Sequence, residues 1–408
     1  MYERILVRYG DLTLKGKNKR KFVKHAVALI KEKVNNLFVS YEKNHDRLYI
    51  KLNGEDHQAI IEGLNKVSGL LGYSLVTKTE KDIDIIAEKS LELVKEKGTF
   101  PRSFKVETKR ADKTYPLESL EISKQVAGYV LKNTDHLSVD VKNPQMLLNI
   151  EVRNDGAYIF LDRIPGMGGF PVGIAGKGLL MISGGIDSPV AGFLSMKQGV
   201  EIEVIHFEST PLTSIESAQK VVDLTKKLAV FAPRNTIKLH MVPFKALHEA
   251  LIKNIPESYN ITIMRRMMYR IASQFAMRDH TPVLINGESV GQVASQTLES
   301  MHVVNHVTTL PILRPLVTTD KHDIITLAKK IGTYDISIKP FEDCCTVYVP
   351  KAPVTNPRVM YAERYERLFD YKTLIKEALD NIKTLDIHKD TDLHLEYEGF
   401  TVSEALEE

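Results

Sequence analysis

The second half of the chain alternates short apolar runs with longer stretches in which apolar residues recur every three or four positions. The short runs have the length of buried strands, and the longer stretches have the period of helices that pack on one side. This alternation is typical of an α/β fold with a doubly wound parallel sheet, whose helices cover both faces. We expect its strands at 179–182, 201–207, 236–242 and 282–286, and its helices at 189–198, 215–231 and 264–278.

The first 165 residues follow a different pattern, with two groups of strands and helices in succession. Residues 1–75 alternate strands and amphipathic helices in a way that predicts a ferredoxin-like α+β domain. Residues 76–165 form a second α/β domain, and the glycine-rich residues 166–178 are a predicted linker to a third domain at 179–408. The expected elements are strands at 4–9, 47–52, 103–108, 147–152 and 157–163, and helices at 19–37, 59–67, 82–96 and 119–131.

One apolar run, 179–182, leads directly into Ser183-Gly184-Gly185-Ile186-Asp187-Ser188, and Pro189 follows as the expected first helical residue. The two glycines allow a turn with positive φ and a close backbone approach, and proline suits the first helical position. Free N–H groups at a helix N-terminus bind anions, and an aspartate there can hold Mg²⁺ carried by a nucleotide. We therefore expect a phosphate-binding loop at 183–188, although its spacing is not that of a Walker A loop.

Size and cysteine content narrow the class of protein. A chain of 408 residues has room for two or three domains. It has no apolar run long enough to span a membrane and no secretory signal at its start, so we expect a cytoplasmic protein without a membrane partner. Its two cysteines are neighbours, Cys344 and Cys345, which excludes a disulfide framework and suggests chemistry. They could also be small buried residues, but the adjacent Glu342, Asp343 and Thr346 argue against a core position.

Positive charge is concentrated near the N-terminus, although the net charge is only +3. The first 60 residues hold 13 Lys and Arg against 7 Asp and Glu, and no acidic residue lies between Asp11 and Glu32. Such a cluster suits nucleic-acid phosphates, but a solvated, lysine-rich helix face has the same composition. The residues concerned are Lys15, Lys17, Lys19, Arg20 and Lys21.

The loop at 183–188 resembles the signature of the PP-loop ATP pyrophosphatases, which split ATP into AMP and pyrophosphate. Four other segments of the chain resemble the tRNA uridine 4-sulfurtransferases, also called 4-thiouridine synthetases. They are segment 8–18, segment 109–122, which looks like an RNA-binding THUMP domain, and the two segments 287–297 and 313–316. The resemblance implies a ferredoxin-like, a THUMP and a PP-loop domain in the three regions above, with a THUMP start as early as residue 61.

The resemblance also implies an activity and a set of site residues. The enzyme would adenylate O4 of uridine 8 in tRNA and replace this oxygen with sulfur from a cysteine persulfide. ATP and Mg²⁺ would be required, with Asp187 on the metal and Lys321 neutralising charge as pyrophosphate leaves. Lys109, Arg110 and Lys113 would contact RNA together with the N-terminal basic residues. The ATP site would comprise Met181, Ile182, Ser183, Gly184, Gly185, Asp187, Ser188, His206, Phe207, Arg265, Gly287 and Gln296.

Several of these residues also have a plain structural explanation. His206 and Phe207 could simply end a buried strand. Arg265 lies among methionines that are typical of a core helix, and Lys321 could be a solvated lysine near a helix start. The sequence pattern alone leaves both explanations open.

For the sulfur step, the resemblance favours Cys345 as the persulfide carrier and makes Cys344 the weaker candidate. Longer family members carry a rhodanese domain that we do not expect here, so sulfur would come directly from a cysteine desulfurase. A homodimer remains open. The alternatives are another PP-loop tRNA thiolase or ligase, and a non-catalytic RNA-binding protein, which would not need Asp187 and the cysteine pair.

Overall fold

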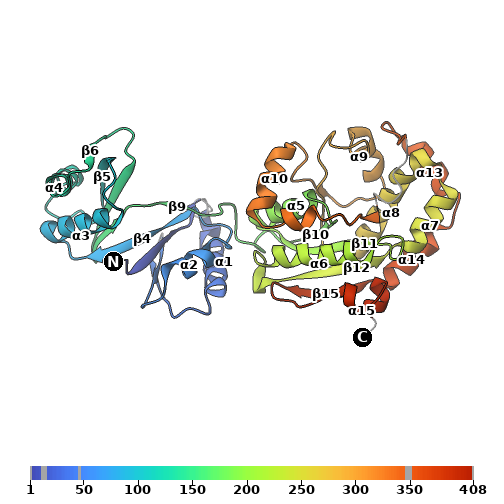
Figure 1. Ribbon diagram of the computed structural model, residues 1–408, viewed down its shortest axis with the longest axis horizontal. Helices are drawn as coiled ribbons and strands as arrows, with labels where there is room; N and C mark the ends of the chain where they lie inside the picture. The colour runs from blue at the N-terminus through green and yellow to red at the C-terminus, as the bar shows by residue number, and fades with distance from the viewer. Residues whose placement is uncertain (1, 11–15, 45–46, 345–351, 407–408) are drawn as a thin grey trace. The chain divides into compact units, whose positions relative to one another are not determined.

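The computed structural model shows two compact units, Met1–Pro171 and Val172–Glu408 (Figure 1). Each unit has its own sheet and its own apolar core. Within the residues that the structure describes, no helix is both long and apolar enough to cross a lipid bilayer. These residues are 2–10, 16–44, 47–344 and 352–406.

The first unit begins with the predicted ferredoxin-like arrangement. Its elements are β1 (Arg4–Arg8), α1 (Lys19–Lys33), β2 (Ser40–Asn44), β3 (Arg47–Lys51), α2 (His57–Leu64) and β4 (Gly72–Thr79). β1 pairs antiparallel with β3 and β4, and the strand order is β2-β3-β1-β4. Alternation along β1 places Ile5 and Val7 in the core with α1 and α2, and Leu6 in a second cluster. β2 was not predicted, because its sequence SYEKN has no apolar alternation.

The sheet of the first unit continues past residue 75, where the sequence placed a domain boundary. β4 spans this position and pairs with β8, so both parts of the unit share one strand. Helices α3 and α4 pack together over the second part of the sheet (Figure 1). The elements here are α3 (Ile83–Glu96), β5 (Arg102–Arg110), α4 (Ser119–Lys132), β6 (Leu137–Val139), β7 (Met146–Arg153) and β8 (Gly156–Phe160).

The glycine-rich residues of the expected linker begin in contact with the first unit. The short strand β9 (Ile164–Pro165) pairs with β4. The amides of Gly166 and Gly168 then donate to the carbonyls of Leu71 and Leu70, both at 2.9 Å. A Cβ on Gly166 would lie 2.3 Å from the Leu70 carbonyl oxygen, so this backbone approach requires glycine.

The second unit contains the predicted parallel sheet, in the order β14-β13-β10-β11-β12-β15. All neighbouring strands from β14 to β12 are parallel, whereas β15 pairs antiparallel with β12 and was not predicted. Because the chain continues from β10 to β11 on one side and returns to β13 on the other, β10 lies at the switch point where such sheets bind ligands. The strands are β10 (Lys177–Met181), β11 (Glu201–Glu208), β12 (Thr236–Pro243), β13 (Leu284–Ile285), β14 (Ile312–Leu313) and β15 (Lys383–His388).

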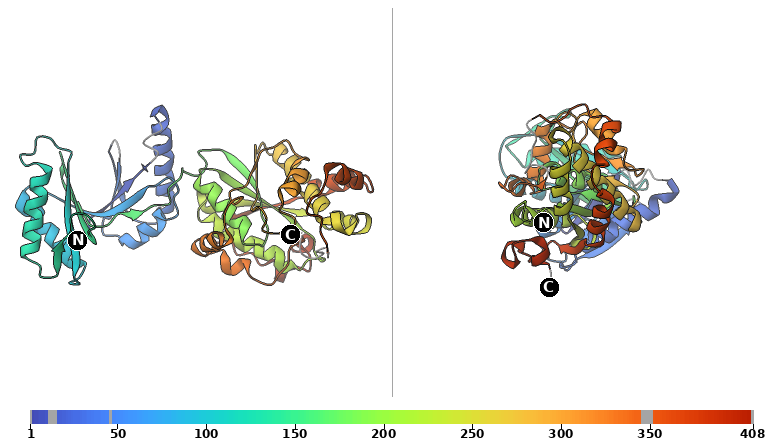
Figure 2. Two further views of the ribbon diagram at one scale, coloured as in Figure 1. Left: turned by 90° about the horizontal axis from the view of Figure 1, so that it is seen from above. Right: turned by 90° about the vertical axis from the view of Figure 1, so that its right-hand side faces the viewer.

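Helices cover both faces of this sheet (Figure 2). α5 (Asp187–Lys197) and α6 (Ile215–Ala229) pack on one face, and α8 (Glu257–Arg278) packs on the other. Two neighbouring residues of β10 show the alternation: Leu179 belongs to the core with α8, and Leu180 points at Gly192 of α5. α8 begins at Glu257 instead of the predicted Met264, so it is longer than the predicted helix.

The acidic C-terminal stretch packs against the rest of the second unit. It forms two short helices, α15 (Leu395–Glu398) and α16 (Val402–Ala405). Leu395 and Val402 are buried, and the Leu395 amide donates to the Gln219 side chain of α6 at 2.8 Å. These two buried side chains thus anchor the C-terminal stretch on the second unit.

Candidate active site

The predicted phosphate-binding loop lies between β10 and α5, at the carboxyl edge of the parallel sheet. Two predicted details are wrong. α5 begins at Asp187 instead of Pro189, and neither Gly184 nor Gly185 has a positive φ. Glycine at 184 serves close packing instead, because a Cβ there would lie 3.1 Å from the Lys220 Cδ atom.

Two serines hold the loop in shape. The Ser188 Oγ atom accepts from the Ser183 amide at 2.9 Å and donates to the Ser183 carbonyl at 3.2 Å, since a hydroxyl group can do both. The Ser183 Oγ atom accepts from the Gly185 amide at 3.4 Å. The conformation of the loop is therefore stabilised by hydrogen bonds from its own two serine side chains.

His206 and Phe207 end β11 next to the loop, and their side chains belong to the core. His206 Nδ1 lies 3.1 Å from the Ile182 carbonyl oxygen, and the side chain is buried. The Phe207 ring packs edge-on against Phe244, with the centroids 5.5 Å apart. Both side chains are therefore buried within this unit, as expected for residues that end a buried strand.

Gly287 follows β13 and touches the start of α5 so closely that no side chain fits between them. An ideal Cβ on Gly287 would lie 2.7 Å from the Asp187 carbonyl carbon and 2.7 Å from the Ser188 amide nitrogen. Both atoms belong to the helix backbone and cannot rotate away, so glycine sets the position of the phosphate loop against the segment after β13.

We expect Gly287→Ala to separate these two segments and to lower the free energy of unfolding by about 1–3 kcal/mol, the usual range for overpacking. Chemical denaturation measures the change. Gly128→Ala on α4 is the matched control, because a Cβ there meets nothing within 4 Å and alanine favours the helix. Equal loss of stability in both variants, or none in either, would contradict this account of Gly287.

Asp187, the first residue of α5, is held by two side chains. Lys321 Nζ, at the start of α10 (Lys321–Lys330), lies 2.7 Å from Asp187 Oδ1, although the two residues are 134 positions apart. Gln292 Nε2 donates to Asp187 Oδ2 at 2.8 Å. The structure thus brings together the two predicted catalytic groups, and the Lys321 side chain is 42% exposed, so the pair faces solvent. Gln292 was not among the predicted site residues, although it lies in segment 287–297, which resembles the family.

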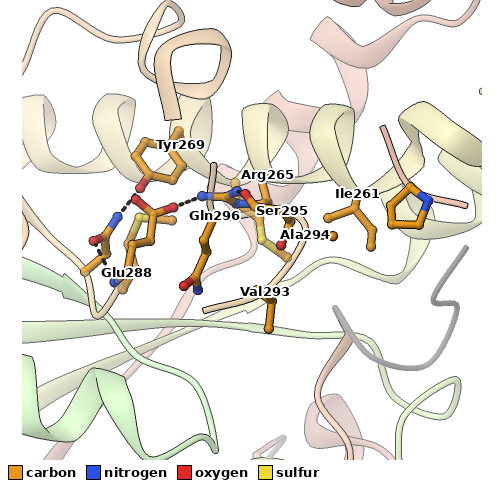
Figure 3. A pocket seen from close by; sticks show the side chains of 12 residues that line it. Ile261, Arg265, Tyr269, Glu288, Val293, Ala294, Ser295 and Gln296 are labelled. Atoms are coloured by element: carbon orange, nitrogen blue, oxygen red, sulfur yellow. Dashed lines mark hydrogen bonds and ion pairs between the residues drawn. The ribbon is translucent and has the colours of Figure 1, made fainter. Parts of the chain in front are cut away.

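A pocket of about 400 Å³ opens beside this loop, between the end of β10, α8 and the segment after β13 (Figure 3). Three of the predicted ATP-site residues line it: Met181, Arg265 and Gln296. Its walls combine apolar side chains such as Ile261 and Met268 with polar groups at one end, as in sites for flat heterocycles with polar edges. Figure 3 shows Arg265 reaching from α8 toward Glu288.

The pocket arginine is fixed by an acidic partner that sequence reasoning did not identify. Arg265 forms an ion pair with Glu288 and donates to the Ser295 carbonyl. Glu288 also pairs with Arg314, whose Nε atom is 2.6 Å from Glu288 Oε2. Arg265 is therefore a pocket residue, whereas Met264 and Met267 on the same helix belong to the core.

The chain segment before the cysteine pair reaches the phosphate loop. Asp343 Oδ2 accepts the Gly184 amide at 2.7 Å, and the Ser337 hydroxyl donates to the Gly185 carbonyl at 3.2 Å. Cys344 is only 5% exposed and belongs to the apolar core, so the expectation against a core position is wrong for this residue. Cys345, the favoured persulfide carrier, lies outside the described residues.

Comparison with known proteins agrees with this arrangement over the whole chain. The family model described as thiamine biosynthesis protein (ThiI) matches residues 173–371. Models of the ThiI ferredoxin-like domain and of the THUMP domain match residues 4–74 and 80–162. A protein of Acholeplasma laidlawii named "Probable tRNA sulfurtransferase" is 52% identical over 406 residues, which cover 100% of this chain and 98% of that protein. The chain belongs to the tRNA sulfurtransferase family.

Other relatives agree with this family. A protein of the same name from Brevibacillus brevis is 46% identical over 379 residues, 93% of this chain and 94% of that protein. The solved structure of a 4-thiouridine synthetase in complex with RNA and bound ATP is 37% identical, with a TM-score of 0.86. The match covers 95% of this chain and 100% of that one. The three-domain organisation expected from the sequence is that of the sulfurtransferase family.

The RNA-contact residues expected for a sulfurtransferase lie in the first unit. Lys17 precedes α1, and Arg20 and Lys21 lie exposed in its first turn, whereas Lys19 is half-buried. Lys15 lies outside the described residues.

A second expected group of RNA contacts lies at the end of β5 and in the loop that follows it. Lys109 and Lys113 are exposed. The Arg110 guanidinium instead donates to the carbonyls of Tyr115 and Leu117, at 3.0 and 3.3 Å. Arg110 therefore shapes the loop that follows β5, while the two lysines face solvent.

Proposed function

We propose that the chain adenylates O4 of uridine 8 in tRNA and replaces this oxygen with sulfur, releasing AMP and pyrophosphate and leaving 4-thiouridine. The proposal is carried by one observation. A phosphate loop, the Asp187–Lys321 pair and the Asp343-Cys344 segment meet at the carboxyl edge of one sheet. The solved relative with RNA and ATP supports the choice of substrates.

ATP would bind across the switch point of the sheet. The pocket beside Arg265 has the size and lining for a nucleobase, and the backbone at Met181 and Ile182 lies at its edge. The phosphates would meet the loop amides and the positive end of the α5 dipole. Lys321, which already contacts Asp187, would neutralise the charge that develops as pyrophosphate leaves.

The donor set at the loop fits a Mg²⁺ ion carried by ATP. Mg²⁺ typically takes one or two protein carboxylates together with substrate phosphates, and Asp187 supplies a carboxylate next to the phosphate loop. The described residues contain no cluster of three or more His, Cys, Asp or Glu side chains that would form a resident metal centre. When bound, the ion would screen the charge of the phosphates, and Asp187 would be the side chain that holds it.

Sulfur would come from a persulfide on Cys345, loaded by a cysteine desulfurase. The terminal sulfur attacks C4 of the adenylated uridine, and AMP leaves with the former O4 oxygen. The Cys344 thiolate then attacks the sulfur of Cys345, which breaks the S–S bond and leaves sulfur on the base. The protein keeps a Cys344–Cys345 disulfide, which a thiol reductant returns to two thiols.

The basic cluster at the start of α1 gives a prediction about RNA binding. We expect replacement of Lys17, Lys19, Arg20 and Lys21 by alanine to weaken tRNA binding and to flatten its dependence on salt, by about one unit of slope for each lost phosphate contact. Filter binding at several salt concentrations measures both quantities. Lys226→Ala and Lys227→Ala on α6, in the other unit, serve as the charge control. Wild-type affinity and slope in the quadruple variant would mean that the cluster is only a solvated helix face.

One experiment tests the proposed function directly. The full chain is incubated with a tRNA transcript, Mg-ATP, a thiol reductant, cysteine and a cysteine desulfurase, and the digested RNA is examined by mass spectrometry. We expect 4-thiouridine with the normal transcript and none with a transcript that carries cytidine at position 8. A thionucleoside at another position would instead indicate another PP-loop tRNA thiolase, and no thionucleoside would contradict the proposal.

A further inference from the structure

We propose that Asp343 is an internal anion of the phosphate loop, and that the phosphate groups of a bound nucleotide displace it. Asp343 is then a positioning residue, which makes the placement of Cys344 depend on whether the loop is occupied. This inference rests on the proposed function, because it takes the loop to be the site of the pyrophosphate moiety of ATP.

The contact itself has the features of anion binding. The Gly184 amide donates to Asp343 Oδ2 at 2.7 Å, a short distance that is typical of a hydrogen bond to a carboxylate. The two residues are 159 positions apart, so the carboxylate is brought to the loop by the fold. A Cβ on Gly184 would lie only 3.3 Å from this oxygen, so the missing side chain makes room for it. A phosphate oxygen bound to the same amide would occupy the same place.

Lys220 supplies a positive charge at this contact. Its stem passes Gly184, and its ammonium group donates to the carbonyls of Lys339 and Phe341 at 2.9 and 3.3 Å. The side chain is buried on α6, and this burial lowers the pKa of Lys220 while the Asp343 carboxylate acts in the opposite direction. The charge of Lys220 attracts the Asp343 carboxylate, and it would equally attract a phosphate group that took the place of this carboxylate.

The consequence concerns Cys344, the next residue. Its thiol is 5% exposed while Asp343 is bound to the loop. Displacement of the carboxylate removes the attachment immediately before it, so Cys344 becomes more accessible when phosphate groups enter. By thermodynamic linkage, loss of the Asp343 contact must in turn favour phosphate binding. Nucleotide binding thereby favours exposure of the Cys344 thiol.

The first test is a calorimetric titration of the full chain with inorganic pyrophosphate and Mg²⁺. We expect Asp343→Asn to bind pyrophosphate about tenfold more tightly than the wild type, because a charged competitor for the Gly184 amide is lost. Glu342→Gln removes the same charge one residue away, at an exposed side chain, and is expected to bind as the wild type does. Thermal unfolding confirms that each variant is folded.

The second test measures the accessibility of the thiol. In a Cys345→Ser background, the rate of alkylation of Cys344 is expected to rise when pyrophosphate is added. With Asp343→Asn in the same background, the rate is expected to be high already and to change little. A merely structural role of Asp343 would not produce this dependence on the ligand.

The outcomes separate the two proposals. If the wild type makes 4-thiouridine while Asp343→Asn binds pyrophosphate equally or more weakly, the internal-anion proposal is overturned and the proposed function stands. An alkylation rate that does not respond to pyrophosphate also overturns it. If the wild type neither binds pyrophosphate nor makes 4-thiouridine, both proposals fail.

Discussion

Replacement of Asp187 by alanine is expected to slow the tRNA-dependent release of pyrophosphate by about 100-fold or more, the usual cost of losing a charged group at a reacting phosphate. The carboxylate lies at the N-terminus of α5 and contacts Lys321 and Gln292, so its loss removes the proposed metal ligand and one partner of the lysine. An enzyme-coupled pyrophosphate assay measures the rate. tRNA affinity is expected to stay near the wild-type value, because the predicted RNA-contact residues lie in the other unit.

Two further variants make this result specific. Lys321→Ala is expected to lose less activity than Asp187→Ala, because the Lys321 side chain is 42% exposed and solvent cations partly replace it. Asp323→Ala removes an exposed carboxylate from the first turn of the same helix, α10, and is expected to keep full activity. Undiminished pyrophosphate release by Asp187→Ala would show that Asp187 takes no part in this reaction.

The cysteine pair is expected to separate the two half-reactions. Cys345→Ser should still release pyrophosphate in the presence of tRNA but should form no 4-thiouridine, because activation of the base needs no sulfur. A single reaction mixture gives both readouts: pyrophosphate from the coupled assay and the thionucleoside from mass spectrometry. Cys344→Ala should retain at least part of the thiolation when an external thiol is supplied, since this thiol can replace Cys344 in breaking the S–S bond.

The choice of substitution follows from the structure. Cys344 is buried in an apolar cluster, and alanine avoids placing an unpaired hydroxyl group there. Pyrophosphate release at the wild-type rate shows that each variant retains its nucleotide site. Full thiolation by a variant that lacks both cysteines would exclude a persulfide mechanism.

The phosphate loop could be predicted because its signals are local. An apolar run, two glycines, an aspartate and a proline lie within one short segment, and each has a direct conformational meaning. The reason for the glycines could not be predicted in the same way. Gly184 gives room to Lys220 and Asp343, and both partners come from distant parts of the chain.

Contacts between residues that are far apart in the chain could not be predicted from the hydrophobic pattern or from motif spacing. Only the family resemblance joined Asp187 with Lys321, and no pattern indicated Gln292 as a partner of Asp187 or Glu288 as a partner of Arg265. Lys220 is the one charged residue among the buried residues of α6, and the periodic pattern of the helix gives no sign of its role. β15 was missed because only one of its residues, Ile387, is buried, so its edge position leaves no apolar alternation.

The central claim is that ATP is split between its α and β phosphates to activate one uridine of tRNA. The most direct test uses ATP labelled at the α phosphate, with a tRNA transcript, Mg²⁺, a thiol reductant, cysteine and a cysteine desulfurase, and compares the labelled products with the 4-thiouridine formed. The account predicts labelled AMP in an amount equal to 4-thiouridine, and little AMP without tRNA. Labelled ADP in place of AMP, or 4-thiouridine formed without consumption of ATP, would contradict it.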